Sequence, residues 1–200
     1  AAHAGCHPER GVNAITIASL AIAQLHRDGW LGKISKLDHS KRRKTGTANV
    51  GVFSGGDATN VVTPLVQIRA EARSHDPAFR KQIVAAIEKA FKKAAATVKN
   101  EAGVCGSVEF DGRLDYESFL LADNDPSLLA CEAAVRSVGG NPKRKISDGG
   151  LDANSMSQRL VPTVTMGAGQ IEPHTVNEQI DLAQFRQACR VALRLATGRY

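Results

Sequence analysis

The chain has 200 residues, of which 42% are hydrophobic and 23% charged, as is ordinary for a folded globular protein. No run of about eighteen apolar residues occurs, so we expect no membrane-spanning helix and no membrane partner. The four cysteines are scattered and form no Cys-x-x-Cys pair, which argues against a thiolate zinc knuckle and favours a reducing cytoplasmic location. We expect no signal peptide within the given residues, and the start at Ala1 leaves room for an upstream segment.

The first part of the chain, residues 1–122, alternates strand and helix patterns. Asp76-Pro77 is an N-cap followed by a first-turn proline, and the apolar residues after it recur at helical spacing. In chain order we expect the end of a strand at 1–4, a helix over 8–26, strands over 47–53 and 61–73, a helix from 76 to about 98, and a strand over 103–121. Such a β-α-β-β-α-β unit folds as a four-stranded sheet with both helices on one face.

The net charge of +6 is partly concentrated in one basic run, Lys41–Lys44. A phosphate or nucleic-acid contact is one interpretation. The flanking Ser40 and the Thr45–Thr47 turn favour a solvated loop instead. We expect no nucleic-acid partner, because the polar faces of the predicted strands lack the aromatic residues on which bases stack.

Composition changes at 122–126, which predicts a domain boundary there and a second domain over 123–200. Pro126 begins a helix, and Val161–Met166 is a continuously apolar segment typical of a buried parallel strand. Asp181 caps a last helix whose expected inward face comprises Leu182, Phe185, Cys189, Leu193 and Ala196. The predicted fold class is therefore α/β: an α+β first domain followed by part of an α/β domain, with too few elements to complete a sheet.

His174 is a candidate metal ligand, because it follows the glycine-spaced exit Met166–Gly169 of a predicted strand. α/β enzymes place metal ligands at the carboxyl edge of a sheet in this way. Glu178 either steadies this loop or interacts with the N-terminal dipole of the following helix. A catalytic zinc site needs about three protein ligands, and no His-x-Asp motif or glutamate pair completes one.

Three residues of the first domain are candidate substrate contacts. Asn60 offers an amide at a strand start, and Arg73 offers a guanidinium on the polar face of the same strand; together they suit a carboxylate or carbonyl oxygen. Arg73 pairs equally well with Glu71. His3 lies between small residues at a strand end, where it either approaches a substrate or is simply exposed.

A glycine loop, Gly149–Asn154, supplies the remaining candidates, Gly150, Asp152 and Asn154. Asp152 and Asn154 are equally well explained as turn and cap residues, since Gly-Gly-x-Asp often begins a helix.

Several of these motifs occur together and in order, which makes them specific. They are Ala2-His3-Ala4-Gly5, Pro8-Glu9-x-Gly11-x-Asn13-Ala14-Ile15, Gly51-x-x-Ser54-Gly55-Gly56-x-Ala58-Thr59-Asn60-Val61-Val62, Glu71-Ala72-Arg73-Ser74, Gly149–Asn154 and His174-Thr175-x-Asn177-Glu178. In this register the chain resembles the peptidase T branch of the co-catalytic zinc aminoacylase and peptidase family. The resemblance implies a lid or dimerisation domain followed by the C-terminal part of a zinc-binding catalytic domain.

The resemblance also implies roles. His174 corresponds to the last ligand of a two-zinc cluster, and His3 to the lid histidine that polarises the scissile carbonyl, commonly in the partner subunit's site. Asn60 and Arg73 correspond to lid groups that hold the substrate, and the Gly149–Asn154 loop to one that borders the cleft. The implied enzyme is a homodimeric zinc metallopeptidase that hydrolyses small peptides, like a tripeptide aminopeptidase, or a related amidohydrolase acting on N-acyl amino acids.

The chain departs from the family pattern in three places. Thr63-Pro64 replaces a proline directly after the two valines, and Ser35–Lys44 is longer and more basic than usual. The segment with the bridging aspartate, the other ligands and the general-base glutamate would precede Ala1. We therefore expect the isolated chain to be inactive, and a non-catalytic dimerisation or binding module remains the alternative.

Overall fold

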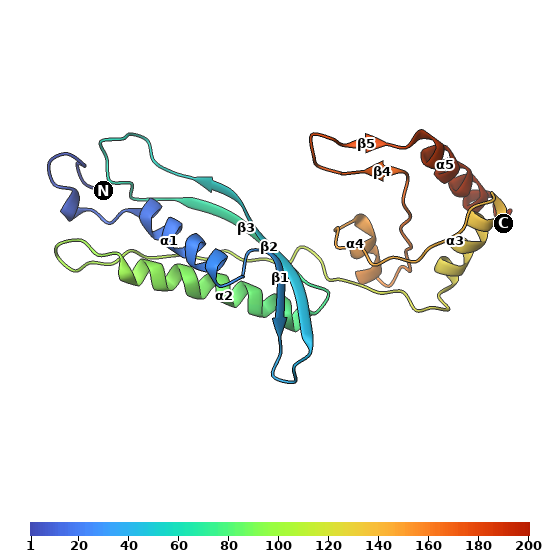
Figure 1. Ribbon diagram of the computed structural model, residues 1–200, viewed down its shortest axis with the longest axis horizontal. Coiled ribbons are helices and arrows are strands. Elements are labelled where there is room, and N and C mark those ends of the chain that lie inside the picture. The colour runs from blue at the N-terminus through green and yellow to red at the C-terminus, as the bar shows by residue number, and fades with distance from the viewer. The chain divides into compact units, whose positions relative to one another are not determined.

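The computed structural model describes residues 1–200 and contains two compact units, 1–114 and 115–200, which we describe separately (Figure 1). Compactness alone does not define a folding domain, so the domain limits 1–122 and 123–200 stay a prediction. The mixed α/β fold class is confirmed: a small antiparallel sheet packs with helices. No helix is long and apolar enough to cross a membrane.

Unit 1 contains one antiparallel sheet with the strand order β1-β2-β3. Its elements are a short 3-10 turn over Pro8–Arg10, α1 (Ala14–Arg27), β1 (Gly32–Leu37), β2 (Arg43–Ser54), β3 (Gln67–Arg73) and α2 (Pro77–Thr97). β1 and β2 form a hairpin in which Gly32 pairs with Ala48. β2 then pairs with β3 from Thr47 opposite Arg73 to Ser54 opposite Gln67, and the register shifts between Val50 and Val52.

The helix α1 begins six residues later than Pro8, where the sequence predicted its start. Pro8–Arg10 forms only a single 3-10 turn, and Gly11 is extended. Asn13 then caps the helix, its side-chain oxygen accepting from the Thr16 amide at 3.1 Å. The Ala14 amide donates to the Thr63 carbonyl at 2.9 Å, so the start of α1 is fixed to the segment that enters β3.

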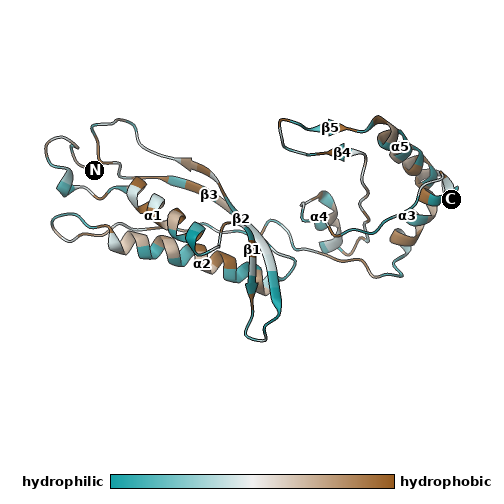
Figure 2. Ribbon diagram, in the orientation of Figure 1, coloured by the Kyte–Doolittle hydropathy of each residue, from teal (hydrophilic) through white to brown (hydrophobic).

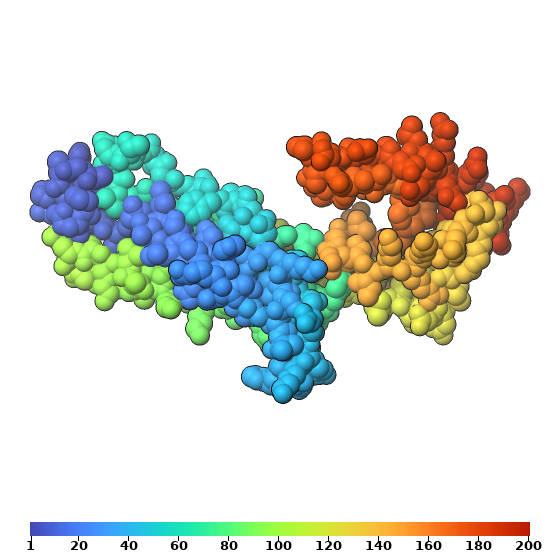
Figure 3. Space-filling model, in the orientation of Figure 1, coloured from blue at the N-terminus to red at the C-terminus, as the bar shows by residue number.

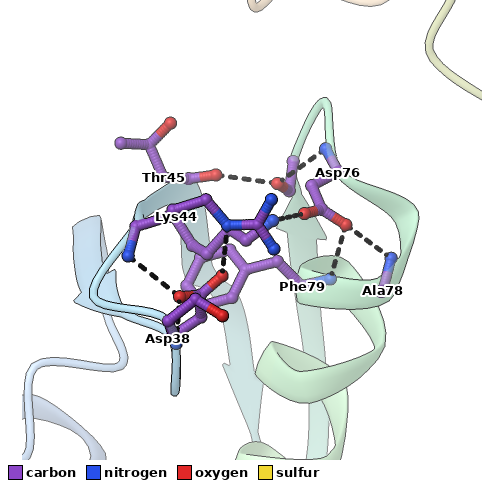
Figure 4. Close-up of polar contacts among 9 residues, drawn as sticks. Asp38, Lys44, Thr45, Asp76, Ala78 and Phe79 are labelled. Carbon is purple, nitrogen blue, oxygen red and sulfur yellow. Dashed lines mark hydrogen bonds and ion pairs between the residues drawn. The ribbon is translucent and has the colours of Figure 1, made fainter.

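The helix α2 begins where the sequence predicted, because its cap is local chemistry. The carboxylate of Asp76 accepts hydrogen bonds from the amides of Ala78 and Phe79, and Pro77 occupies the first turn. Figure 4 shows that the same carboxylate meets the Lys44 ammonium from β2, at 2.5 Å. These bonds, with Lys44 first, hold the pKa of Asp76 below its usual value.

Two clusters of buried side chains form the core of unit 1, and both join the sheet to the helices. One lies between α1 and α2 around Leu25 and Phe91, and the other joins Ile34 and Ala48 of the sheet to α2. Trp30 packs against both clusters, and the centroid of its ring lies 6.2 Å from that of Phe79. Figure 2 shows apolar residues along both helices and the strands.

The sheet has three strands, not the predicted four, and two expectations about its edges are wrong. β1 was not predicted, because only Ile34 in its middle is buried. The basic run of Lys41–Lys44 lies around the tip of the β1–β2 hairpin, which projects in Figure 3. Residues 103–121 contain no strand beyond a bridge of Cys105 to Lys99. Val108 there packs on the core instead, and Phe110 meets Phe91 edge-on.

Unit 2 has a smaller buried core than unit 1. It contains α3 (Pro126–Ser137), α4 (Asp152–Gln158), α5 (Leu182–Thr197) and the two-residue strands β4 (Gln170–Ile171) and β5 (Gln179–Ile180). The helices α3 and α5 pack together. Asp181 caps α5 as predicted, and Asp125 caps α3; each accepts from two backbone amides.

Two expectations about buried surfaces in unit 2 are wrong. Val161–Met166 is not a strand, and both end residues are exposed. The predicted inward face of α5 is also exposed: Leu182 and Leu193 retain 61% and 64% of their accessible surface. Val191 is the buried side chain of α5. Within residues 1–200 nothing covers the apolar face that the helical spacing identified.

Candidate functional site

His3 and Asn60 are brought together by backbone pairing. His3 forms an antiparallel bridge with Val61. On its two sides the Ala4 amide donates to the Asn60 carbonyl at 2.9 Å, and the Val62 amide donates to the Ala2 carbonyl at 2.8 Å. Two candidate residues that are far apart in the sequence therefore lie on neighbouring backbone segments.

The imidazole of His3 is exposed but held by the turn that follows it. Its Nδ1 atom accepts from the amide of Gly5 at 3.1 Å and from that of Cys6 at 3.2 Å. The His3 carbonyl accepts from the amide of His7 at 3.0 Å, which closes the turn. The other ring nitrogen, Nε2, has no partner among these bonds.

The segment that carries Asn60 is shaped by two glycines. A β-carbon on Gly55 would lie 2.6 Å from the Leu65 carbonyl oxygen, and Gly56 adopts a φ of +92°. The close approach at Gly55 and the positive φ at Gly56 each favour glycine. A shallow hollow lies between Ser54–Asp57 on one side and Pro64 and Leu65 on the other.

Arg73 ends β3, and its guanidinium donates to the Glu71 carboxylate at 2.7 Å. This is the ion pair that the sequence offered as an alternative to substrate binding. Both side chains remain partly exposed, at 40% and 53%.

Arg73 and His3 lie at opposite ends of unit 1. Arg73 is next to Asp76, where α2 begins, whereas the chain after His3 reaches the other end of α2: the Glu101 amide donates to the Glu9 carbonyl at 2.8 Å. Because α2 has 21 residues, the two ends are about 30 Å apart. Figure 1 shows the chain start beside the end of α2. The structure thus brings Asn60 to His3 but does not bring Arg73 to either.

His174 lies in the loop between β4 and β5, with an exposed side chain and a φ of +65°. Glu178 holds this loop: one carboxylate oxygen accepts from the His174 amide at 3.1 Å and the other from the Gln170 side chain at 2.8 Å. These bonds, the one from Gln170 first, keep the pKa of Glu178 below its usual value. Glu178 therefore steadies the loop by a backbone contact and leaves the imidazole of His174 free.

The Gly149–Asn154 loop is folded around Asn154, which is buried. The side-chain oxygen of Asn154 accepts from the Leu151 amide at 3.0 Å, and its nitrogen donates to the Glu117 carbonyl at 2.9 Å. Both ends of this amide are thus bonded to backbone, as the turn-and-cap interpretation predicted. Asp152 is exposed in the first turn of α4.

Tyr116 is a neighbour of this loop that sequence reasoning did not identify as part of the site. Its hydroxyl and ring occupy the space that a β-carbon on Gly150 would need. The only signal for it was the apolar side of the alternation over 103–121, which predicts packing and says nothing about the partner.

A metal centre does not fit within these residues alone. No three histidine, cysteine, aspartate or glutamate side chains lie close enough to hold an ion. His174 supplies one accessible imidazole, and the ionised Glu178 beside it is bonded to the loop. The structure therefore shows no complete metal site, and His174 stays a candidate ligand.

Comparison with known proteins identifies the family of this chain. Residues 1–99 match the model of a peptidase dimerisation domain. Over 97% of its length the chain is 36% identical to the aminopeptidase PepT from Bacillus cereus, with a TM-score of 0.68. Against a tripeptidase from Staphylococcus aureus, over the same share of the chain, identity is 31% and the TM-score is 0.75. The chain belongs to the peptidase T-like branch of the family that carries this dimerisation domain.

The matched relatives are longer than this chain. It spans 47% of each of the two crystal structures and 47% of YqjE from Bacillus subtilis, to which it is 33% identical over 194 residues. An aminobenzoyl-glutamate utilization protein from Klebsiella pneumoniae shares only the fold, at 17% identity and a TM-score of 0.52. The chain thus contains the peptidase dimerisation domain and spans about half the length of these relatives.

Proposed function

We propose that this chain is the lid and C-terminal part of a zinc-dependent aminopeptidase that cleaves small peptides such as tripeptides. The likeness to an aminopeptidase and a tripeptidase over nearly the whole chain carries the proposal. His3 polarises the scissile carbonyl, Asn60 and Arg73 hold the substrate, and Gly150, Asp152 and Asn154 border the cleft.

The separation of His3 and Arg73 supports a homodimer with shared sites. A tripeptide spans about 10 Å when extended, whereas the two ends of α2 are about 30 Å apart. Even with long side chains, one lid cannot place both residues on one such substrate. If both residues bind the same peptide, one comes from each subunit. The dimerisation domain would hold the two subunits together in such a dimer.

The metal in this proposal is held mostly by residues outside 1–200. His174 contributes one ligand from the β4–β5 loop, and zinc, when bound, supplies a Lewis acid and an activated water. Residues outside the chain also cover the exposed apolar face of α5, because burying Leu182 and Leu193 removes apolar surface from water.

The proposal is tested with the full-length protein that contains this chain. Purified protein should contain zinc, should release the N-terminal residue from tripeptides, and should lose both metal and activity to a chelator. A panel of tripeptides, longer peptides and N-acetylated amino acids separates an aminopeptidase from a deacylase. Zinc-replete protein that hydrolyses none of these amides would overturn the proposal in favour of a non-catalytic module.

A further inference from the structure

The two ring nitrogens of His3 are not equivalent. Nδ1 accepts from the Gly5 amide at 3.1 Å and from the Cys6 amide at 3.2 Å. A nitrogen that accepts a hydrogen bond must present its lone pair, so the proton of the neutral ring is on Nε2. Backbone amides cannot reverse their role, which makes this assignment independent of any side chain.

The turn beneath the ring is itself fixed from both sides. Ala4 is bonded to the Asn60 carbonyl, and the His7 amide closes the turn on the His3 carbonyl. The ring lies close to the turn, since a β-carbon on Gly5 would be 3.4 Å from its Cε1 atom and 3.6 Å from its Nδ1 atom. The position of the ring is therefore set by backbone, and Nε2 is the nitrogen that faces away from the turn.

We infer that the amides of Gly5 and Cys6 are positioning groups that hold His3 as an Nε2–H hydrogen-bond donor. The inference rests on the proposed function, in which His3 meets the carbonyl oxygen of the substrate. A developing oxyanion requires a preorganised donor. A general base or a metal ligand would instead require a lone pair at Nε2. The turn thus selects one chemical role for His3 and excludes the other two.

The tautomer is read directly from nitrogen chemical shifts. In full-length protein with isotope-labelled histidine, long-range proton–nitrogen spectra above the titration range of histidine should show His3 with a protonated Nε2 and a hydrogen-bonded, unprotonated Nδ1. The His3 signals are identified by their loss in His3→Gln. A proton on Nδ1, or an even mixture of the two tautomers, would overturn the inference.

Two substitutions of His3 extend the test to turnover. Gln places an amide N–H near the position of Nε2, whereas Asn reaches only the position of Nδ1 and keeps its bonds to the turn. We expect kcat of His3→Gln to exceed that of His3→Asn by about tenfold, the effect of one hydrogen bond to a charged group. His7→Gln, in the same turn, is the control and should retain full kcat.

The outcomes separate the inference from the proposed function. Unimpaired tripeptide hydrolysis by His3→Ala would remove His3 from the reaction, whatever its tautomer. An impaired His3→Ala enzyme in which His3 carries its proton on Nδ1, or in which Gln and Asn are equally poor, would remove only the inference.

Discussion

His3 and Arg73 lie toward opposite ends of α2, and these ends are about 30 Å apart, although both residues are expected to contact substrate. If one residue acts in each subunit, two inactive variants should complement each other. In a hybrid of His3→Ala and Arg73→Ala subunits, one site has both residues intact and the other has neither. Random exchange makes half of the dimers hybrid, so the mixture should regain about a quarter of wild-type activity.

The exchange experiment has a matched control. Mixing His3→Ala with His3→Asn leaves every site without His3 and should restore nothing. Subunit exchange is shown by co-purification of differently tagged chains. If hybrids form and activity stays at the level of the parents, both residues act in the same subunit or Arg73 is structural.

His3→Ala alone should lower kcat by about 10²–10³-fold, the usual loss for one oxyanion donor. Because His3 lies in unit 1 and its Nδ1 is bonded to the turn, zinc content should not change. Atomic absorption and steady-state kinetics check both values. A fall in zinc content parallel to the fall in kcat would make His3 a ligand instead of a donor.

His174→Ala should show the opposite pattern and lose zinc together with activity, because it removes a ligand. The exposed His39, in the turn of the β1–β2 hairpin, is the control, and His39→Ala should keep both. A His174→Ala enzyme with its full zinc content and normal turnover would end the assignment of His174.

Gly150→Ala should destabilise the Gly149–Asn154 loop by about 1–3 kcal/mol, because the new methyl group would overlap Tyr116. Gly149→Ala is a matched control, since its β-carbon would meet only the Ser147 hydroxyl at 3.5 Å. Thermal unfolding of the three proteins gives the comparison. Adding Tyr116→Ala should relieve the strain, so the double variant should be more stable than the sum of the single effects. Additive losses would contradict this packing.

Acid should unfold unit 1 at a higher pH when Lys44 is replaced by Met. The bonds to Asp76 hold the pKa of its carboxyl below the usual 3.8. Their stabilisation is therefore complete above that value and is lost as the pH falls through the lower, folded-state pKa. Lys44→Met removes the largest cause, which raises this pKa and reduces the stabilisation.

Trp30, the single tryptophan of the chain, reports this transition through its fluorescence, because it packs on Phe79 beside the cap. Arg42→Met is the control. Arg42 pairs with Asp38 on the exposed hairpin, and its backbone bond to Asp38 survives the substitution. Equal shifts of the acid midpoint in both variants would mean that the Lys44–Asp76 pair has no special role.

The sequence predicted best where structure depends on neighbouring residues. Asp76-Pro77 and Asp181 cap helices as expected, and α3 begins at Pro126 as expected, because a cap needs only the next three amides. Prediction failed where a contact with a residue far along the chain determines the local structure. Val108 and Phe110 alternate as in a strand but pack on helices.

In the candidate site, too, local features could be predicted and long-range contacts could not. Each side chain was identifiable from its motif, but the pairing of His3 with Val61 is a long-range contact that periodicity does not encode. The exposure of α5 could not be predicted either, because a helical stripe shows that a face is apolar without showing what covers it.

The packing of α1 against α2 along a continuous core has a mechanical consequence. A rigid-body rotation of such a unit would move both of its ends together. A rotation of about 10° around its middle displaces each end of a 30 Å helix by about 3 Å, in opposite directions. Motion that brings the His3 end toward one substrate therefore moves the Arg73 end at the same time, and two sites that share lids would open and close in step.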